Sequence, residues 1–198
     1  MSTFEIVCVT NRKLCRTEFL ERLEKLAQGG VDKIILREKD LEEEAYLRLA
    51  RQALALCGEK LVVHSFPLAC RSLGIGRLHI PLRQLERNPA IRQTAFRLLG
   101  VSVHSPEEAQ KAQALGAAYL TAGHIFDTAC KQGLPGRGLA FLQEVCAAVS
   151  IPVYAIGGIT AHRLSAVRAA GAAGACFMSS FMDCTDTDAA LSVLRRSV

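Results

Sequence analysis

Eight short apolar runs, separated by amphipathic stretches, restrict the fold of this chain more than any other feature. The runs are Ile6–Thr10, Lys33–Arg37, Leu61–Ser65, Arg77–Pro81, Leu98–His104, Tyr119–Ile125, Pro152–Ile159 and Ala175–Ser179. Most of them are continuously apolar rather than alternating, which is typical of strands that are buried on both faces of a parallel sheet. The sequence therefore predicts eight parallel strands, each followed by a crossover to the next.

The stretches between these runs have helical spacing. Residues 19–27 carry apolar side chains at i, i+1, i+4, i+7 and i+8, which makes one apolar stripe for packing against a sheet. Ser105-Pro106-Glu107-Glu108 combines an N-cap serine, proline at the first helical position and a capping-box glutamate. Strands and helices that alternate in this way predict a compact α/β fold, the (β/α)8 TIM barrel, as a single domain over residues 1–198.

An open doubly wound sheet is the alternative fold. Its phosphate fingerprint, GxGxxG after the first strand, is missing, because Thr10-Asn11-Arg12 follows that strand instead. The 198 residues give about 25 residues to each of eight units, fewer than the roughly 31 of a typical barrel. The expected barrel is therefore a trimmed one.

Composition and charge exclude several classes of protein. Half of the residues are hydrophobic, yet no apolar run reaches the roughly 18 residues of a membrane span. The N-terminus lacks the pattern of a signal peptide, and the eight cysteines show neither a CxxC pair nor zinc-type spacing. We therefore expect a cytoplasmic protein with reduced thiols, no membrane contact and no disulfides.

The formal net charge of +5 is mild, and it is compatible with an anionic substrate. The basic residues are scattered rather than clustered, and tryptophan is absent, so the chain offers no stacking platform for nucleic acid. We expect a small-molecule ligand and no nucleic acid partner. Barrels of this size often pair, so a homo-oligomer is compatible with the sequence, which shows no clear apolar stripe for it.

A parallel barrel carries its active site at the C-terminal ends of its strands, so polar residues there are the candidates. They are Thr10, Arg37, Glu38, Lys39, His64, Ser65, Ser102, His104, Ser105, His124, Thr128, Lys131, Gly157, Gly158, Ser179 and Ser180. Gly157-Gly158 after the seventh run and Ser179-Ser180 after the eighth predict a phosphate site, because glycines let backbone N–H groups approach an anion closely.

Other strand ends are less specific. His124 is suited to proton transfer near neutral pH, and it is equally compatible with a structural hydrogen bond. Arg37 and Lys39 have the charges to hold a carboxylate or phosphate, or they form a surface charge cluster. No two carboxylates fall near the ends of the third and fourth strands, so we expect no metal site.

Three motifs resemble the thiamine phosphate synthase superfamily. They are Ile35–Asp40 (ILREKD), Gly100–Ala109 (GVSVHSPEEA) and Pro152–Ile159 (PVYAIGGI). Within that superfamily, the stretch Gly123–Thr128 (GHIFDT), followed by Cys130-Lys131, is similar to the TenI branch, the thiazole tautomerases. The resemblance covers nearly the whole chain, with the motifs in the same order.

The resemblance implies an isomerase that needs no cofactor and no metal. Its substrate would be a carboxylated thiazole ethyl phosphate in a non-aromatic form, and its product the aromatic thiazole. His124 would carry the proton, and Arg37 or Lys39 would hold the carboxylate. The remaining implied ligand contacts are Gly157, Gly158, Met178 and Ser179 for the phosphate, with Ser105, Thr128, Cys130 and Lys131 around the ring.

Departures from the synthase pattern argue against one of two alternatives, the synthase. Synthases of the superfamily carry Asn-Asp where this chain has His64-Ser65, and a further aspartate where it has Gln84. Those aspartates hold magnesium for a pyrimidine diphosphate, and their loss removes ions that offset the charge of the leaving pyrophosphate. The alternatives are thiamine phosphate synthase activity and a non-catalytic, regulatory protein that binds the thiazole phosphate.

Overall fold

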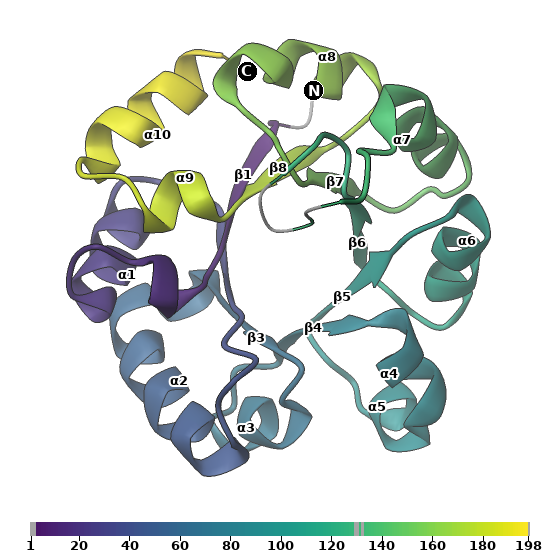
Figure 1. The fold of residues 1–198 in the computed structure, drawn as a ribbon. Coiled ribbons are helices and arrows are strands. Elements are labelled where there is room, and N and C mark those ends of the chain that lie inside the picture. The colour runs from purple at the N-terminus through teal and green to yellow at the C-terminus, as the bar shows by residue number, and fades with distance from the viewer. Residues whose placement is uncertain (1–2, 129–130, 132, 198) are drawn as a thin grey trace.

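A computed structural model describes residues 3–128, 131 and 133–197, in which eight strands form a ring surrounded by helices (Figure 1). The strands are β1 Glu5–Val9, β2 Lys33–Leu36, β3 Leu61–His64, β4 Arg77–Pro81, β5 Leu98–Val103, β6 Tyr119–Gly123, β7 Val153–Ile156 and β8 Gly174–Phe177. Each strand pairs in parallel with the next, and β8 pairs with β1. The predicted (β/α)8 barrel is confirmed, and the open doubly wound sheet is excluded.

Helices cover the outside of the barrel. They are α1 Phe19–Gln28, α2 Glu43–Cys57, α3 Pro67–Ser72, α4 Leu82–Arg87, α5 Pro89–Gln93, α6 Pro106–Ala114, α7 Gly138–Ala147, α8 Leu164–Ala169, α9 Ser179–Met182 and α10 Thr187–Arg196. The predicted stripe of α1 packs inward through Leu23 and Leu26. Among the described residues, no helix is both long enough and apolar enough to span a membrane.

Local capping differs in detail from the predicted capping box. Ser105 is the N-cap of α6, and its hydroxyl accepts a hydrogen bond from the N–H of Glu108 at 3.1 Å. The Glu108 carboxylate bonds to the N–H of His104, at 2.6 Å, rather than to that of Ser105. The carboxylate of the capping box therefore bonds one residue earlier than predicted. This bond holds His104, which directly follows β5.

Most strands end one or more residues before the predicted limit. Thr10 and Ser65 lie just past β1 and β3, although their backbone N–H groups still bond to Ile35 and His79 of the neighbouring strands, and Ser65 has a positive φ of 65°. The cysteines of the described residues are all free thiols. Cys8, Cys57 and Cys176 are buried, whereas Cys146 is only partly buried.

A column of rings occupies the interior of the barrel. The rings of His64, His79, Tyr119 and Tyr154 follow one another with centroid separations of 5.7, 5.4 and 5.2 Å. His79 Nδ1 lies 3.0 Å from the Tyr119 hydroxyl, and its Nε2 lies 2.8 Å from Ser102 Oγ. Gly100 is required beside them, because a Cβ there would collide with the Tyr119 ring and with His79.

The two buried histidines of this column are neutral. Burial lowers the pKa of His79 to about 3. Burial lowers the pKa of His64 to about 2, and the unfavourable interaction that a protonated His64 would have with a protonated His79, Arg37 and Lys39 adds to the shift. Desolvation disfavours the charged form of an imidazole, so protonating either ring in the folded barrel is costly.

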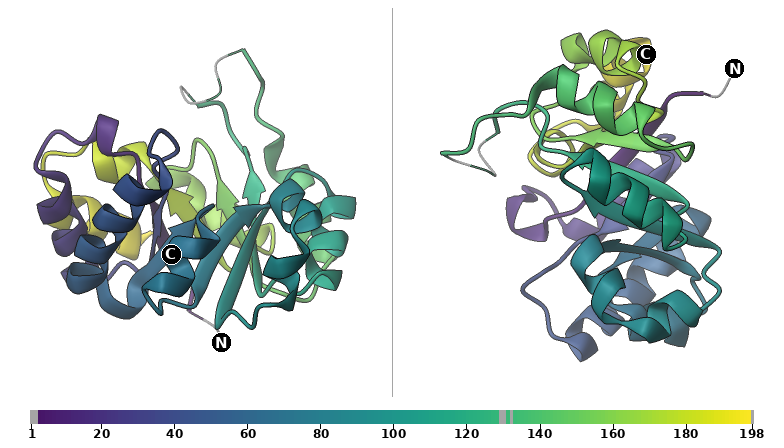
Figure 2. Two further views of the ribbon diagram at one scale, coloured as in Figure 1. Left: turned by 90° about the horizontal axis from the view of Figure 1, so that it is seen from below. Right: turned by 90° about the vertical axis from the view of Figure 1, so that its right-hand side faces the viewer.

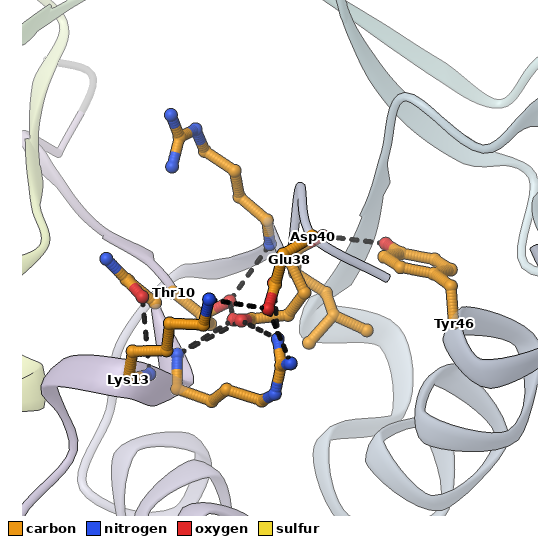
Figure 3. A network of polar contacts seen from close by, with 9 residues as sticks. Thr10, Lys13, Glu38, Asp40 and Tyr46 are labelled. Atoms are coloured by element: carbon orange, nitrogen blue, oxygen red, sulfur yellow. Dashed lines mark hydrogen bonds and ion pairs between the residues drawn. The ribbon is translucent and has the colours of Figure 1, made fainter. Parts of the chain in front are cut away.

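A buried carboxylate fixes the ends of β1 and β2 (Figure 3). Glu38 is 2% exposed and accepts a hydrogen bond from the Thr10 hydroxyl at 2.6 Å. Both of its oxygens accept from the Arg12 backbone N–H at 3.1 Å, and one accepts from the Arg12 guanidinium at 3.0 Å. Asp40 bonds to the same guanidinium and to Lys13, and these cations hold the pKa of Asp40 below its usual range.

Tyr46 makes the matching link to β3. Its hydroxyl donates to the Leu36 carbonyl at 2.6 Å and accepts from the His64 N–H at 3.0 Å. Figure 3 shows this ring on α2, pointing at the end of β2. The carboxyl ends of the first three strands are therefore held by side-chain hydrogen bonds in addition to the sheet ladder.

Replacing Glu38 with Gln should lower the free energy of unfolding by about 2 kcal/mol, because a buried amide NH2 would face the N–H donors of Arg12. Urea unfolding monitored by circular dichroism measures this loss. The matched control is Asp40→Asn, which changes the exposed acid on the same guanidinium and should cost clearly less. Equal losses in the two variants would contradict the assigned role of Glu38.

Stability should fall as the pH drops from 7 to 5. The unfolded histidines bind a proton near pH 6.5, whereas folded His79 and His64 bind it only near pH 3 and pH 2. Below pH 6.5 the unfolded state therefore binds more protons, and each histidine costs about 1–2 kcal/mol by pH 5. His79→Gln should flatten this slope in urea titrations, and His162→Gln, at an exposed site, should not. An unchanged slope in His79→Gln would disprove the assignment.

Candidate functional site

The C-terminal ends of all eight strands meet at one end of the barrel, which we call the mouth. Figure 2 shows the connection between β6 and α7 standing out from this end. Every candidate residue from the sequence that the structure describes lies at a strand end here or in the segment that follows it. The predicted contact Cys130 lies outside the described residues.

The glycines after β7 lie against the segment after β6. Gly157 has a φ of 100° and Gly158 a φ of 63°. A Cβ on Gly157 would collide with the side chain of His124, and a Cβ on Gly158 would lie 2.5 Å from the Asp127 carbonyl oxygen. Both positions therefore require glycine for the backbone conformation and for the close approach.

Arg163 holds this glycine turn in place, and sequence reasoning missed it. Its guanidinium donates to the Gly158 carbonyl at 2.7 Å and lies over the Phe126 ring, 4.3 Å from the ring centroid. The sequence gives little indication of this role, since an arginine five residues after the glycine turn has the same pattern as a charged residue on a helix surface. These two contacts link α8 and the segment after β6 to the β7 turn.

Met178 and Ser179 follow β8, the neighbour of β7. Ser179 begins the short helix α9 and is exposed, and Met178 precedes it. Because β7 and β8 pair over Tyr154–Ile156, their ends lie side by side at the mouth. The structure thus brings the four predicted phosphate contacts to two adjacent strand ends.

His124 and His104 lie at the ends of β6 and β5. His124 is partly buried, and its Nε2 lies 3.2 Å from the Leu134 carbonyl oxygen. His104 places Nδ1 2.9 Å from the Gly123 carbonyl oxygen. The His104 ring therefore ties β5 to β6. His124 lies beside Gly157 and contacts the segment that stands out from the mouth.

Ser105 and Thr128 have structural contacts of their own. The Ser105 hydroxyl caps α6, as described above. Thr128 is partly buried, and its carbonyl accepts a hydrogen bond from the Lys131 N–H at 3.0 Å. Roles of these two residues in ligand binding stay predictions.

A group of cations lies around Lys39 at the mouth. It consists of Arg37 and Lys39 after β2, Arg83 in the first turn of α4, and Lys131, and we call these four residues the mouth cations. Burial and the positive charges of the other three lower the pKa of Lys39. Sequence reasoning missed Arg83, although its place just after the fourth strand was visible.

Magnesium, which the resemblance to synthases implies, does not fit the ends of β3 and β4. His64 is buried and neutral there, and the Ser65 carbonyl accepts a hydrogen bond from the Gln84 side-chain amide at 3.0 Å. No group of three His, Cys, Asp or Glu side chains suited to a metal occurs in the part of the chain that the structure describes. Magnesium prefers carboxylate oxygens and water, and this donor set offers no carboxylate.

Comparison with known proteins identifies relatives over nearly the whole chain. The family model described as thiamine monophosphate synthase matches residues 6–181. The putative thiamine-phosphate synthase 2 of Aquifex aeolicus is 34% identical over 182 residues, which cover 90% of this chain and 97% of that protein. The thiamine-phosphate synthase 2 of Streptococcus pneumoniae is 31% identical over 186 residues, covering 91% and 89%.

A solved structure agrees with these sequence relatives. Thiamine phosphate pyrophosphorylase from Pyrococcus furiosus superposes with a TM-score of 0.82 at 25% identity, covering 99% of this chain and 96% of that one. A 3-hexulose-6-phosphate synthase at 19% identity, with a TM-score of 0.72, shares the fold; the match covers 98% of this chain and 100% of that one.

These relatives correct the expected reaction class. Thiamine-phosphate synthases are transferases, so the expectation of a cofactor-independent isomerase is wrong, although that of an enzyme is supported. The TenI-type stretch after β6 is a weak guide to the reaction, because one short segment cannot decide the chemistry of a mouth built from eight strand ends. The expected superfamily is confirmed: with a family match over residues 6–181, the chain belongs to the thiamine monophosphate synthase family.

Proposed function

We propose that this chain is a transferase of the thiamine-phosphate synthase type. It would bind a phosphorylated thiazole and a pyrimidine that carries a diphosphate on a methylene group. The thiazole nitrogen would form a bond to the methylene carbon, and the bond from that carbon to the diphosphate oxygen would break with its electron pair. The products would be thiamine phosphate and pyrophosphate.

One observation carries this proposal: a single mouth contains two separate regions suited to anions. The turn at Gly157-Gly158 with Ser179 follows β7 and β8, whereas three of the mouth cations follow β2 and β4 and Lys131 lies in the segment after β6. A protein that binds one phosphorylated ligand needs only one such region. Two phosphorylated substrates need both, and the names of the relatives agree with that use.

The β7–β8 side is the proposed site of the thiazole phosphate. Glycines with positive φ present backbone N–H groups without a side chain in the way, which suits an anion. In barrels of this type, the loops after the seventh and eighth strands frequently bind phosphate. Met178, Ser105, Thr128 and His124 would line the thiazole ring, with His124 nearest the glycine turn.

The mouth cations are the proposed site of the diphosphate. Positive charges held in place before the reaction stabilise the negative charge that develops on a leaving group. Arg37, Lys39 and Lys131 were expected to contact the thiazole substrate, and in this proposal they would contact the second substrate.

A non-catalytic protein that binds the thiazole phosphate is the second candidate. It is favoured by one observation, the absence of a carboxylate at the described positions where the resemblance to synthases implies magnesium ligands. This candidate keeps the β7–β8 phosphate site and lacks turnover.

Purified protein supplied with both substrates should form thiamine phosphate, measured by mass spectrometry with and without magnesium. Omitting either substrate is the control for contaminating product. Binding of the thiazole phosphate in calorimetry without any product would reject the transferase and leave the binding protein.

Ser179→Asp should weaken binding of the thiazole phosphate by about 10- to 100-fold, because a carboxylate would repel the phosphate across the β8 end. Calorimetry with the phosphorylated and the dephosphorylated thiazole measures this, and only the phosphorylated form should lose affinity. Ser165→Asp is the matched control, since it adds the same charge on the exposed face of α8. An equal loss in both variants would contradict the proposed site.

A further inference from the structure

Arg22, in α1, is a buried cation without an acid partner. It is 2% exposed, and it forms no ion pair within the described residues. Its Nε is buried and has no hydrogen-bond partner there. A guanidinium is always charged, and burying it costs free energy unless an anion lies beside it. Arg22 would therefore stabilise a negative charge that forms next to it.

The guanidinium contacts four neutral acceptors, and two of them belong to Cys184, in the connection between α9 and α10. One amino group donates to the Cys184 sulfur and to the Thr187 hydroxyl, both at 2.7 Å. The other donates to the Cys184 carbonyl oxygen at 2.6 Å and to the Thr17 hydroxyl at 3.3 Å. The thiol itself donates to the Phe181 carbonyl oxygen at 3.4 Å. Of the four acceptors, only the sulfur readily becomes an anion, as a thiolate or as an oxidised acid.

The acids around this contact do not supply the missing charge. A cavity of about 250 Å³ lies beside Arg22. The other charged residues in its wall, all of them exposed, are Glu21, Lys25, Asp186 and Asp188. Asp183, which precedes the cysteine, pairs with Arg16 instead. The cavity leaves room for a small solute next to the arginine, whose own contacts are all uncharged.

Cys184 differs from the other described cysteines in this contact. Like Cys15 and Cys146 it is partly exposed, whereas the remaining four are buried. The Cys15 sulfur lies 3.8 Å from the Thr17 hydroxyl, and burial raises the pKa of Cys146 to about 11. Solutes can therefore reach three of the described sulfurs, and one of these three lies against a buried cation.

We propose that Cys184 is a modification site, at which peroxides oxidise the sulfur and Arg22 pairs with the anion that forms. In the first step the sulfur bonds to one peroxide oxygen and gives up its proton, the O–O bond breaks, and the products are sulfenic acid and water. A second peroxide converts the sulfenic acid to sulfinic acid and releases a second water. The charged sulfinate oxygens are stronger acceptors for Arg22 than the neutral sulfur is. This oxidation is independent of the transferase reaction.

Dimedone, which bonds to sulfenic acids, is the probe for the first step. The full chain is treated with hydrogen peroxide and dimedone at neutral pH, and peptide mass spectrometry measures the labelling rate of each cysteine. Cys184 should be labelled at least about 5-fold faster than Cys15 or Cys146, the scale of one charge interaction at contact distance in water. Arg22→Met should lower the rate at Cys184 to about that of Cys15, and Arg22→Lys, which keeps the charge, should retain most of it.

A purely structural role of Arg22 predicts the opposite change. Loosening the connection after α9 would expose the Cys184 sulfur further and raise its labelling in Arg22→Met. Thermal unfolding checks that both variants are folded, and the comparison of Cys184 with Cys15 in the natural sequence needs no variant. The proposal is overturned if Cys184 is labelled no faster than Cys15 there, or if Arg22→Met leaves the rate at Cys184 unchanged or raises it.

Discussion

The pairing of β8 with β1 is the constraint on which the rest of the structure depends. Closing the sheet brings eight carboxyl ends, distributed between residues 9 and 177, into one ring. Without closure, the glycine turn after β7 and the cations after β2 would lie at distant places along an open sheet. With closure, each strand needs to contribute only one or two side chains, because all of them meet at the mouth.

The fold could be predicted from the sequence, because continuous apolar runs at regular intervals have few other interpretations. The strand limits could not be placed to the residue, since Thr10 and Ser65 lie outside the regular strands and yet each keeps one backbone hydrogen bond to the neighbouring strand. The phosphate-type turn was also visible, because Gly157-Gly158 follows a strand. The roles of Arg83 and Arg163 could not be predicted, because an arginine near a helix start resembles an ordinary surface residue until the fold shows which groups lie beside it.

The reaction class shows the limit of motif reasoning. The stretch around His124 suggested proton transfer, and the full-length relatives are synthases. The substitutions at Ser65 and Gln84 are nevertheless real features of this chain, and they concern charge rather than fold. Negative charge near the mouth is engaged by internal contacts, with Glu38 the clearest case. Around Lys39, in contrast, the nearby charges of Arg37, Arg83 and Lys131 are positive.

Gly100 has a consequence for how such a site can change. Because Gly100 has no side chain, Tyr119 and His79 can pack against its backbone and contact each other. His79 also contacts Ser102 in β5. His79 thus links the ring column of the barrel interior to Ser102, one residue before the end of β5. Substitutions at Gly100, His79 or Tyr119 would disturb the packing of the barrel interior. We therefore expect differences in ligand specificity to arise in the loops after β2, β4 and β6.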